Sequence, residues 1–224
     1  MIILSCDGEI MTCCCPHSRS GGRLFSFFAR RYRQRFSKKG LEPSQQQLLQ
    51  GLEQAGFQDA TVLEIGSGVG HLHMSMLEQG AKSATGIDLA PGMIEEAKDW
   101  AKERGLAGRT RYLQGDFMEM LAQIEPCEVT VLDKVVCCYP DADGLVHRSL
   151  EKTRRVYALT YPRYRWYTRL GEKLGIMLMF LLGSSFRPYV HDPIEIEQWI
   201  RAQGFEKQFQ RNTFIWLTQV YVKS

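Results

Sequence analysis

Short apolar runs alternate with amphipathic stretches along most of the chain from residue 60 onward. Each apolar run is long enough for a buried strand, and each amphipathic stretch has helical spacing. The predicted strands are 60–65, 82–88, 109–114, 128–133 and 156–160. The predicted helices between them are 69–79, 91–105, 117–123 and 144–151. This alternation predicts a parallel sheet with right-handed crossovers, and therefore an α/β fold.

The last part of the chain departs from this alternation. A long helix over 164–182 is basic at its start and apolar at its end, and a second helix, 192–200, begins at the capping residue Asp192. Two further strands, 205–210 and 214–222, have only a short turn between them. That turn predicts an antiparallel hairpin at the edge of the sheet. The whole is then a doubly wound, seven-stranded sheet that is mostly parallel.

Two helices are predicted before the first strand. Residues 23–39 present a broad apolar face with many arginines and lysines around it; Gly40 ends this helix, and Pro43 opens the next. We therefore divide the chain into an N-terminal extension with basic helices, residues 1–57, and an α/β domain, residues 58–224. The extension is expected to lie over the ligand site as a lid, or else to cover an edge of the sheet.

The first predicted strand runs into a glycine-rich turn. Gly66, Gly68 and Gly70 come at alternate positions, and a helix can begin at Gly70. A glycine in such a turn lets a ligand approach the backbone without meeting a Cβ. Asp88 follows about 20 residues later, where a carboxylate commonly holds ribose hydroxyls. Together these features predict a nucleoside cofactor.

The spacing and charge of this turn favour one cofactor over another. A dinucleotide site reads G-x-G-x-x-G, whereas the third glycine comes one residue early in this chain. Glu64, just ahead of the turn, suits a cationic ligand better than a pyrophosphate. S-adenosylmethionine (SAM) carries an ammonium and a sulfonium and no phosphate. Charge therefore favours SAM over a nicotinamide dinucleotide.

Net charge adds to this picture because it is unevenly distributed. The 224 residues carry a formal charge of +3, but residues 1–40 and 151–190 each contain eight Lys/Arg against two Asp/Glu. The rest of the chain is therefore acidic. Two basic segments on an acidic body indicate an anionic substrate or an anionic surface, or simply two solvated helix faces.

The seven cysteines do not predict disulfides. Their number is odd and several are adjacent, so we expect reduced thiols and a cytoplasmic protein. Three consecutive cysteines, 13–15, cannot easily converge with His17 on one ion, so no metal site is predicted. The first residues lack the basic start and long apolar core of a signal peptide, and the apolar run 175–183 is too short to span a bilayer.

Four motifs, taken in order, carry a family resemblance. They are Glu64-x-Gly66-x-Gly68-x-Gly70, Asp88, Gly115-Asp116-Phe117 and the strand that ends at Asp133. They resemble the motifs of class I SAM-dependent methyltransferases. The stretch LDKVVCCYPD, residues 132–141, resembles a bacterial subgroup of these enzymes and, more loosely, the magnesium-protoporphyrin O-methyltransferases. The resemblance covers residues 58–224 as architecture and implies a Rossmann-like fold with SAM as cofactor.

The resemblance also implies roles for individual residues. The turn from Gly66 to Gly70, with Ser67 and Gly68, would pack against the methionine part of SAM. Glu64 would support that turn and the ligand's ammonium, and Asp88 would accept hydrogen bonds from the ribose hydroxyls. The other implied cofactor contacts are Leu89, Asp116 and Phe117 at the adenine, and Asp133 beside the methionine moiety.

Contacts to the methyl acceptor are expected from the loops after the fourth and fifth strands and from the N-terminal helices. The candidates are Tyr32, Tyr139, Tyr161, Arg163, Trp166, Arg187, Tyr189 and His191. Aromatic and arginine side chains suit a flat or anionic small molecule. His191 and Tyr139 are the candidate catalytic groups, although a lone histidine ahead of a helix is more often structural.

These observations predict a SAM-dependent methyltransferase that methylates an oxygen of an anionic or aromatic small molecule. A nucleic-acid acceptor is not expected, because net charge is low and no Asn-Pro-Pro-Tyr signature follows the fourth strand. The helix 164–182 also suits a peripheral membrane contact. A SAM-binding protein without catalysis and a nicotinamide-dependent oxidoreductase stay open as alternatives. The sequence does not indicate an oligomeric state.

Overall fold

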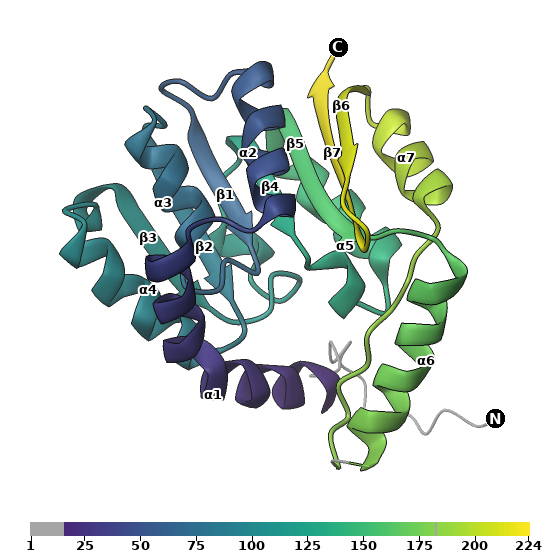
Figure 1. The fold of residues 1–224 in the computed structure, drawn as a ribbon. Coiled ribbons are helices and arrows are strands. Elements are labelled where there is room, and N and C mark those ends of the chain that lie inside the picture. Colours follow the sequence, from purple (N-terminus) through teal and green to yellow (C-terminus); the bar gives the residue numbers. More distant parts are fainter. Residues whose placement is uncertain (1–15, 182) are drawn as a thin grey trace, which may run out of the picture.

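The structure is a computed structural model that describes residues 16–181 and 183–224, with side chains from Phe25 onward in the first helix. Cys13, Cys14 and Cys15 and the side chain of His17 lie outside the described residues. At the centre is one sheet in the order β3-β2-β1-β4-β5-β7-β6 (Figure 1). Its strands are β1 (Thr61–Ile65), β2 (Ser83–Asp88), β3 (Thr110–Gln114), β4 (Cys127–Asp133), β5 (Thr153–Pro162), β6 (Phe205–Asn212) and β7 (Trp216–Lys223).

The pairing of the strands confirms the predicted fold. Strands β1 to β5 are parallel, and β7 runs antiparallel between β5 and β6. The hairpin of β6 and β7 therefore joins the sheet through its second strand, which places the start of β7 beside the end of β5. The sheet is the mostly parallel, Rossmann-like arrangement expected from the alternation of strands and helices.

Helices cover both faces of the sheet. They are α1 (Pro16–Lys39), α2 (Pro43–Ala55), α3 (His71–Glu78), α4 (Pro91–Glu103), α5 (Ala142–Glu151), α6 (Trp166–Leu181) and α7 (Pro193–Ala202). On one face α2, α3 and α4 pack in a core that includes Leu52 and Val131. On the other face α5 and α7 pack in a core that includes Leu132 and Ile196. Val131 and Leu132 are neighbours on β4, so one strand supplies both cores by alternation.

The first helix begins at Pro16, earlier than the predicted start. Gly22 lies within it, and a Cβ at that position would be 3.1 Å from the carbonyl oxygen of Leu89. The missing side chain therefore lets α1 approach the loop after β2. Further along, Arg33 forms an ion pair with Glu96 of α4 at 3.1 Å. These contacts place α1 across the carboxyl-terminal edge of the sheet (Figure 1).

The helix predicted over 117–123 is wrong. The structure has only a 3-10 turn, Leu121–Gln123, in this connection. The connection from β3 to β4 must pass β2 and β1, which is three strand spacings of about 4.8 Å each. Because β3 and β4 are parallel, it must also run from the carboxyl end of the sheet back to the opposite end. A helix advances only about 1.5 Å per residue, which is too little for so short a connection. The segment is therefore mostly irregular, with Phe117 buried in the core.

Candidate functional site

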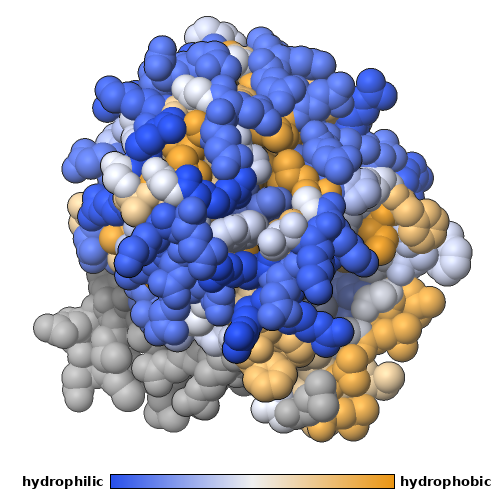
Figure 2. Space-filling model, turned by 60° about the vertical axis from the view of Figure 1, so that its left-hand side comes forward, coloured by the Kyte–Doolittle hydropathy of each residue, from blue (hydrophilic) through white to orange (hydrophobic). Residues whose placement is uncertain are grey.

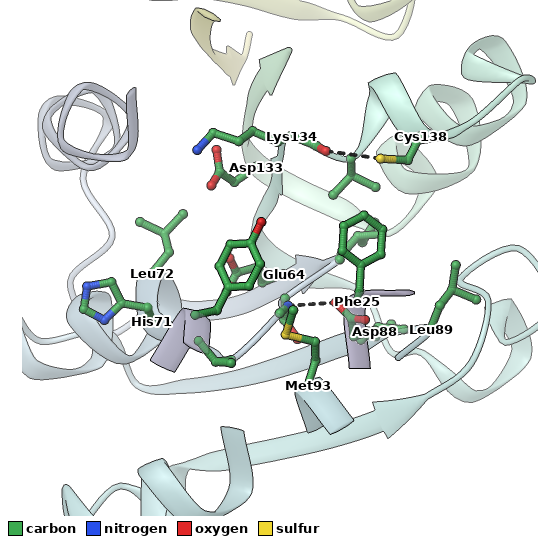
Figure 3. Close-up of a pocket in the computed structure, with 18 of the residues that line it drawn as sticks. Phe25, Glu64, His71, Leu72, Asp88, Leu89, Met93, Asp133, Lys134 and Cys138 are labelled. Atoms are coloured by element: carbon green, nitrogen blue, oxygen red, sulfur yellow. Dashed lines mark hydrogen bonds between the residues drawn. The ribbon is translucent and has the colours of Figure 1, made fainter. Parts of the chain in front are cut away.

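One cavity of about 470 Å³ opens where β1, β2 and β4 end. These strands are neighbours in the sheet, so residues at their carboxyl ends meet at one edge. Glu64 from β1, Asp88 from β2 and Asp133 from β4 each bring a carboxylate to the cavity (Figure 3). Side chains of α1 and α2 also line it. The volume lies within the range of about 300–1,000 Å³ that is usual for small-molecule sites.

Most of the predicted cofactor residues line this cavity. They are Glu64, Gly66, Ser67, Gly68, Asp88, Leu89, Phe117 and Asp133. Gly70 and Asp116 are not among the lining residues. Gly70 starts α3 with a φ of 78°, and a Cβ there would lie 2.8 Å from the His73 ring. Asp116 accepts a hydrogen bond from the backbone N–H of Met118 at 2.9 Å and another from the hydroxyl of Tyr139, so its carboxylate holds two loops together.

The glycine turn is shaped by the protein on one side and open on the other. Gly66 has a φ of 65°, and a Cβ there would lie 2.4 Å from Cγ2 of Val135, so only glycine fits against the loop after β4. Gly68 has a φ of 53° with no atom within 4 Å of the Cβ position. Its N–H donates to Oδ2 of Asp88 at 2.8 Å. The turn therefore leaves backbone exposed to the cavity at Gly68, and the ligand contact there stays a prediction.

Asp88 is partly buried, and its two oxygens are held by the backbone. Besides the bond from Gly68, Oδ1 accepts from the N–H of Ala90 at 2.8 Å. Burial raises the pKa of Asp88 to about 6, while the two backbone hydrogen bonds pull it down and the charge of Glu64 raises it further. The carboxylate thus fixes the glycine turn relative to the end of β2, and it titrates close to neutral pH.

Asp133 has one oxygen satisfied and one without a partner. Oδ2 accepts from Nε2 of Gln45 at 2.8 Å, and Oδ1 is buried with no hydrogen bond. Burial raises the pKa of Asp133 to about 6, against the opposing effects of Lys134 and Gln45. A buried polar atom without a partner costs free energy, so this oxygen is a site for a donor from a bound ligand.

Glu64 is oriented by a chain of hydrogen bonds that the sequence did not reveal. Nδ1 of His73 lies 2.5 Å from Oε2 of Glu64, and the backbone N–H of His73 donates to the same oxygen at 3.3 Å. Nε2 of His73 lies 2.9 Å from the hydroxyl of Tyr112 on β3. Burial raises the pKa of that hydroxyl, which keeps Tyr112 neutral. The chain ties Glu64 to α3 and β3 and leaves it little freedom to move.

The cavity is acidic. Carboxylates of Glu42, Glu64, Asp88 and Asp133 line it, while Lys134 is the one lysine or arginine among the lining residues that the structure describes. Lys134 is itself occupied: Nζ forms an ion pair with Glu42. This charge favours a cationic ligand and disfavours an anionic acceptor in the same space. It therefore weakens the prediction of an anionic substrate, which rested on arginines that lie elsewhere.

The aromatic part of the lining comes from distant segments of the chain. It consists of Phe25, Tyr32 and Phe36 of α1, Phe117, Tyr139 and Trp216. Of the eight predicted acceptor contacts, this group contains Tyr32 and Tyr139. The sequence had identified Phe25 and Phe36 only as an apolar helix face, and it gave no indication of Trp216. Tyr32 and its neighbours on α1 thus line the cavity, and the role of α1 as a lid stays a prediction.

Four predicted acceptor contacts lie away from the cavity. Tyr161 is wrong as a substrate contact, because it is 1% exposed and its hydroxyl donates to Oε1 of Gln219 at 2.6 Å inside the core. Nη1 of Arg163 donates to the Thr213 carbonyl at 3.1 Å. Trp166 is 77% exposed on α6. The side chain of Arg187 lines a separate depression beside α6.

His191 and Tyr189 belong to the loop that precedes α7, outside the cavity lining. Nε2 of His191 lies 3.1 Å from the carbonyl oxygen of Val136 and 3.0 Å from that of Tyr139. Two acceptors at one nitrogen mean that it carries the hydrogen and donates. Burial lowers the pKa of His191, so the ring is neutral. Nε2 of His191 thus holds the loop after β4, and the ring of Tyr189 stacks on the His191 ring.

His71 is sandwiched between two aromatic rings where α1 meets the body. Its ring stacks on Phe36 at 4.5 Å and on Trp100 at 5.1 Å between centroids. Both ring nitrogens are buried without hydrogen-bond partners. Burial lowers the pKa of His71 to about 4, with smaller contributions from Arg104 and other nearby positive groups. The stack therefore requires the neutral form of the ring.

We expect His71→Phe to make the protein less sensitive to acid. The unfolded chain takes up a proton near the ordinary pKa of 6.5, whereas the native ring does so only near 4. The native state is therefore fully stable, as far as this group is concerned, above pH 6.5 and loses stability as the pH falls toward 4. The loss is about 2 kcal/mol, allowing for solvent screening. Chemical unfolding of both proteins at pH 7 and pH 4.5 measures it.

The difference between the two proteins isolates His71. Asp88 and Asp133 have raised pKa values, so their contribution has the opposite sign: it favours the native state at low pH and is lost as the pH rises through about 6. Both groups are present in both proteins and cancel in the comparison. Parallel curves of unfolding free energy against pH would show that His71 is not held neutral by the stack.

With the geometry in place, comparison with known proteins identifies related sequences. Residues 62–158 match the methyltransferase domain family. The chain is 39% identical over 172 residues to the ribosomal protein L11 methyltransferase of Pasteurella multocida, which covers 74% of this chain and 52% of that protein. It is 29% identical over 162 residues to the ubiquinone biosynthesis O-methyltransferase of Pseudomonas paraeruginosa, covering 69% and 68%. The chain thus spans about half the length of the L11 methyltransferases it matches.

A solved structure has the same fold over almost the whole chain. Magnesium protoporphyrin IX methyltransferase from Synechocystis PCC 6803, solved with bound SAH, matches with a TM-score of 0.63 at 17% identity. The match covers 97% of this chain and 90% of that one. At this identity the likeness concerns the fold alone.

Proposed function

This chain carries a class I SAM-dependent methyltransferase domain, and on that premise we propose that it transfers the methyl group of SAM to an oxygen of a small aromatic molecule. The observation that carries the proposal is the cavity itself. It combines an open glycine turn and three carboxylates at the strand ends with an aromatic wall from the N-terminal helices and β7. A cationic nucleoside fits the first part, and a flat acceptor fits the second.

The residues at the strand ends suit SAM in detail. Gly68 leaves room for a ligand at the turn, and Asp133 Oδ1 lacks a donor that an ammonium would supply. Asp88, at the end of β2, would accept from ribose hydroxyls, and Leu89, Met93 and the other apolar side chains beyond it would contact the adenine. Glu64, held by His73, would stabilise the cationic end of the ligand. The acidic lining as a whole supports a cation.

The chain's own part in the reaction is to align and to exclude water. Bound SAM supplies a methyl group already activated by the sulfonium, so the protein needs no strong acid or metal for the transfer. Phe25, Tyr32 and Phe36 would hold the acceptor flat against the methyl and keep the cavity dry. An acceptor that is a carboxylate or a phenolate needs no base. For a protonated acceptor, the carboxylates near the cavity are the available bases, since Nε2 of His191 donates to carbonyls.

The relatives give two classes of acceptor to compare. The ubiquinone biosynthesis O-methyltransferase and the magnesium protoporphyrin IX methyltransferase support a cyclic organic acceptor. The ribosomal protein L11 methyltransferases support a protein side chain as second candidate, because identity over the matched region reaches 39%. We favour the small acceptor because aromatic side chains of α1 line the cavity, and its volume of about 470 Å³ lies in the range usual for small molecules.

The test combines binding with transfer. Calorimetric titration should show that SAM and S-adenosylhomocysteine bind the purified chain while NAD does not. Transfer from methyl-labelled SAM should then be screened over phenols, quinols, porphyrin carboxylic acids and purified ribosomal protein L11. Labelling of a small acceptor supports the proposal. Labelling of L11 alone would replace it by the protein acceptor, and SAM binding without any transfer would indicate a binding protein without catalysis.

A further inference from the structure

Helix α6 carries an exposed apolar face along its whole length. Only Thr168 of its 16 residues is buried. Large apolar side chains recur every three or four residues on the exposed side, and each is roughly half exposed or more. This α6 face consists of Trp166, Leu170, Leu174, Met177, Leu178, Phe180 and Leu181. A helix in a globular core turns such a stripe inward, so the α6 face lacks its partner in the described part of the chain.

Basic side chains border the α6 face. Each of the first three apolar residues of the face is directly preceded in sequence by a basic residue. These basic residues are Arg165, Arg169 and Lys173, and all three are exposed. No ion pair among the described residues engages them. The one acidic residue of α6, Glu172, is turned toward the protein, where its Oε1 accepts from the N–H of Val190 at 3.0 Å. The helix thus presents an apolar stripe with a cationic edge and no exposed anion.

The α6 face lies near the cavity. Helix α6 starts shortly after β5, at the carboxyl-terminal edge where the cavity opens. Phe186, in the loop that follows α6, contacts the cavity-lining Phe25 of α1, with 5.6 Å between ring centroids. Phe27, on the same turn of α1, is 82% exposed. Figure 2 shows hydrophobic side chains gathered at the bottom of the molecule, the level at which α6 ends in Figure 1.

We propose that the α6 face lies on an anionic membrane, with the helix in the plane of the headgroups. No helix in the described ranges is long and apolar enough to cross a bilayer, so this contact would be peripheral. The apolar stripe would enter the boundary of the acyl chains, Trp166 would lie at headgroup level, and Arg165, Arg169 and Lys173 would meet lipid phosphates. An apolar acceptor dissolved in the membrane would then be close to the cavity.

A bilayer fits this face better than a second copy of the chain. Two α6 faces packed together would bring the three cations of each copy toward those of the other, with no acidic partner on either helix. An anionic lipid surface neutralises the same cations. The face is also one helix wide and about 24 Å long, which suits an interfacial helix and is narrow for a stable dimer. This inference does not depend on which acceptor is methylated.

Sedimentation with lipid vesicles tests the proposal. The full chain should bind vesicles that contain phosphatidylglycerol at low salt, bind those of phosphatidylcholine at least tenfold less, and be released by high salt. Leu174→Gln combined with Leu178→Gln should weaken binding at least tenfold. Ile194→Gln, at a somewhat more exposed apolar site on α7 that lies off the α6 face, is the control and should bind like wild type.

Two further readouts separate the membrane from other occupants. Tryptophan emission should shift to the blue on vesicle binding, and Trp166→Phe should remove most of the shift. Light scattering should show that the double variant keeps the oligomeric state of wild type. Failure to bind anionic vesicles, an equal loss in Ile194→Gln, or a wild-type dimer that the double variant dissociates would each overturn the proposal; the last would assign the face to a second copy.

Discussion

Gly68→Ala is expected to weaken SAM binding at least about 100-fold, or ~2.7 kcal/mol, while the protein stays folded. The φ of 53° at Gly68 disfavours any side chain, at a cost of about 1–2 kcal/mol for an L-residue. No protein atom lies within 4 Å of the new Cβ, so the fold has room for it. A ligand that contacts the turn would collide with the new Cβ. Calorimetric titration with SAM, together with thermal unfolding, measures the two effects separately.

Gly105→Ala is the matched control for this substitution. Gly105 has a φ of 69°, also has no atom within 4 Å of the Cβ position, and lies on the surface after α4, away from the cavity. The Gly105→Ala variant should have its free energy of unfolding lowered by as much as Gly68→Ala, and it should bind SAM like wild type. If both variants lose affinity, backbone strain in general is responsible. If Gly68→Ala binds as wild type does, the turn does not contact the cofactor.

The cofactor side of the site could be predicted because its signals are local. A strand, a glycine turn and a helix are contiguous in sequence, and Glu64 and Gly68 belong to that one segment. Asp88 and Asp133 end other strands of the same parallel sheet, and all such ends lie at one edge. The alternation of apolar runs was therefore enough to predict that three carboxylates meet. The supporting contacts from His73 and Gln45 have no comparable signal, because each depends on how a helix packs.

The acceptor side could not be predicted in the same way. Tyr161 was misjudged because β5 is buried on both faces, and a strand without alternation does not reveal where each side chain points. Trp216 reaches the cavity since β7 inserts beside β5, where it pairs with Pro162. That order depends on tertiary packing of the hairpin. Phe36 lines the cavity only because α1 packs against the rest of the protein, and that packing cannot be read from the sequence.

Polar residues outside the motifs were misjudged for a related reason. Arg163 and His191 were predicted because they follow the fifth strand, and because arginine suits an anionic acceptor and histidine can act as a base. In the structure their donors satisfy backbone carbonyls of irregular segments, Thr213 for the first and Val136 and Tyr139 for the second. Loops of this kind need side-chain donors when their backbone is withdrawn from water. Residue type alone does not distinguish that demand from catalysis.

Asp88→Asn is expected to raise the dissociation constant of SAM about 100-fold, because it removes the charge that the ribose hydroxyls and the cationic ligand would meet. In the native protein both oxygens of Asp88 accept from backbone N–H groups, of Gly68 and Ala90. An asparagine turns its NH₂ toward one of them, so the glycine turn also loses part of its support. We expect the free energy of unfolding to fall by about 1–3 kcal/mol at pH 5, where the aspartate is largely protonated, and by less at pH 8.

The sign of this pH dependence follows from the raised pKa. Because the native pKa of Asp88 is about 6, above the ordinary 3.8, the ionised form is the less stable one in the empty protein, and its cost grows as the pH rises through 6. Asparagine avoids that cost. Cofactor binding has the opposite trend, because it needs the ionised carboxylate. The affinity of wild type for SAM should therefore rise between pH 5 and pH 7, by up to about tenfold per pH unit for each proton that must be released.

Titrations of wild type, Asp88→Asn and Asp133→Asn from pH 5 to pH 8 separate the two carboxylates. Asp133 also has a pKa of about 6, so each single variant should keep part of the pH dependence and the double variant should lose it. A 2′,3′-dideoxy analogue of S-adenosylhomocysteine identifies the contact. Wild type should prefer the natural compound, and Asp88→Asn should bind both nearly equally. An undiminished preference in Asp88→Asn would mean that the ribose hydroxyls meet some other group, and the assignment of Asp88 would fail.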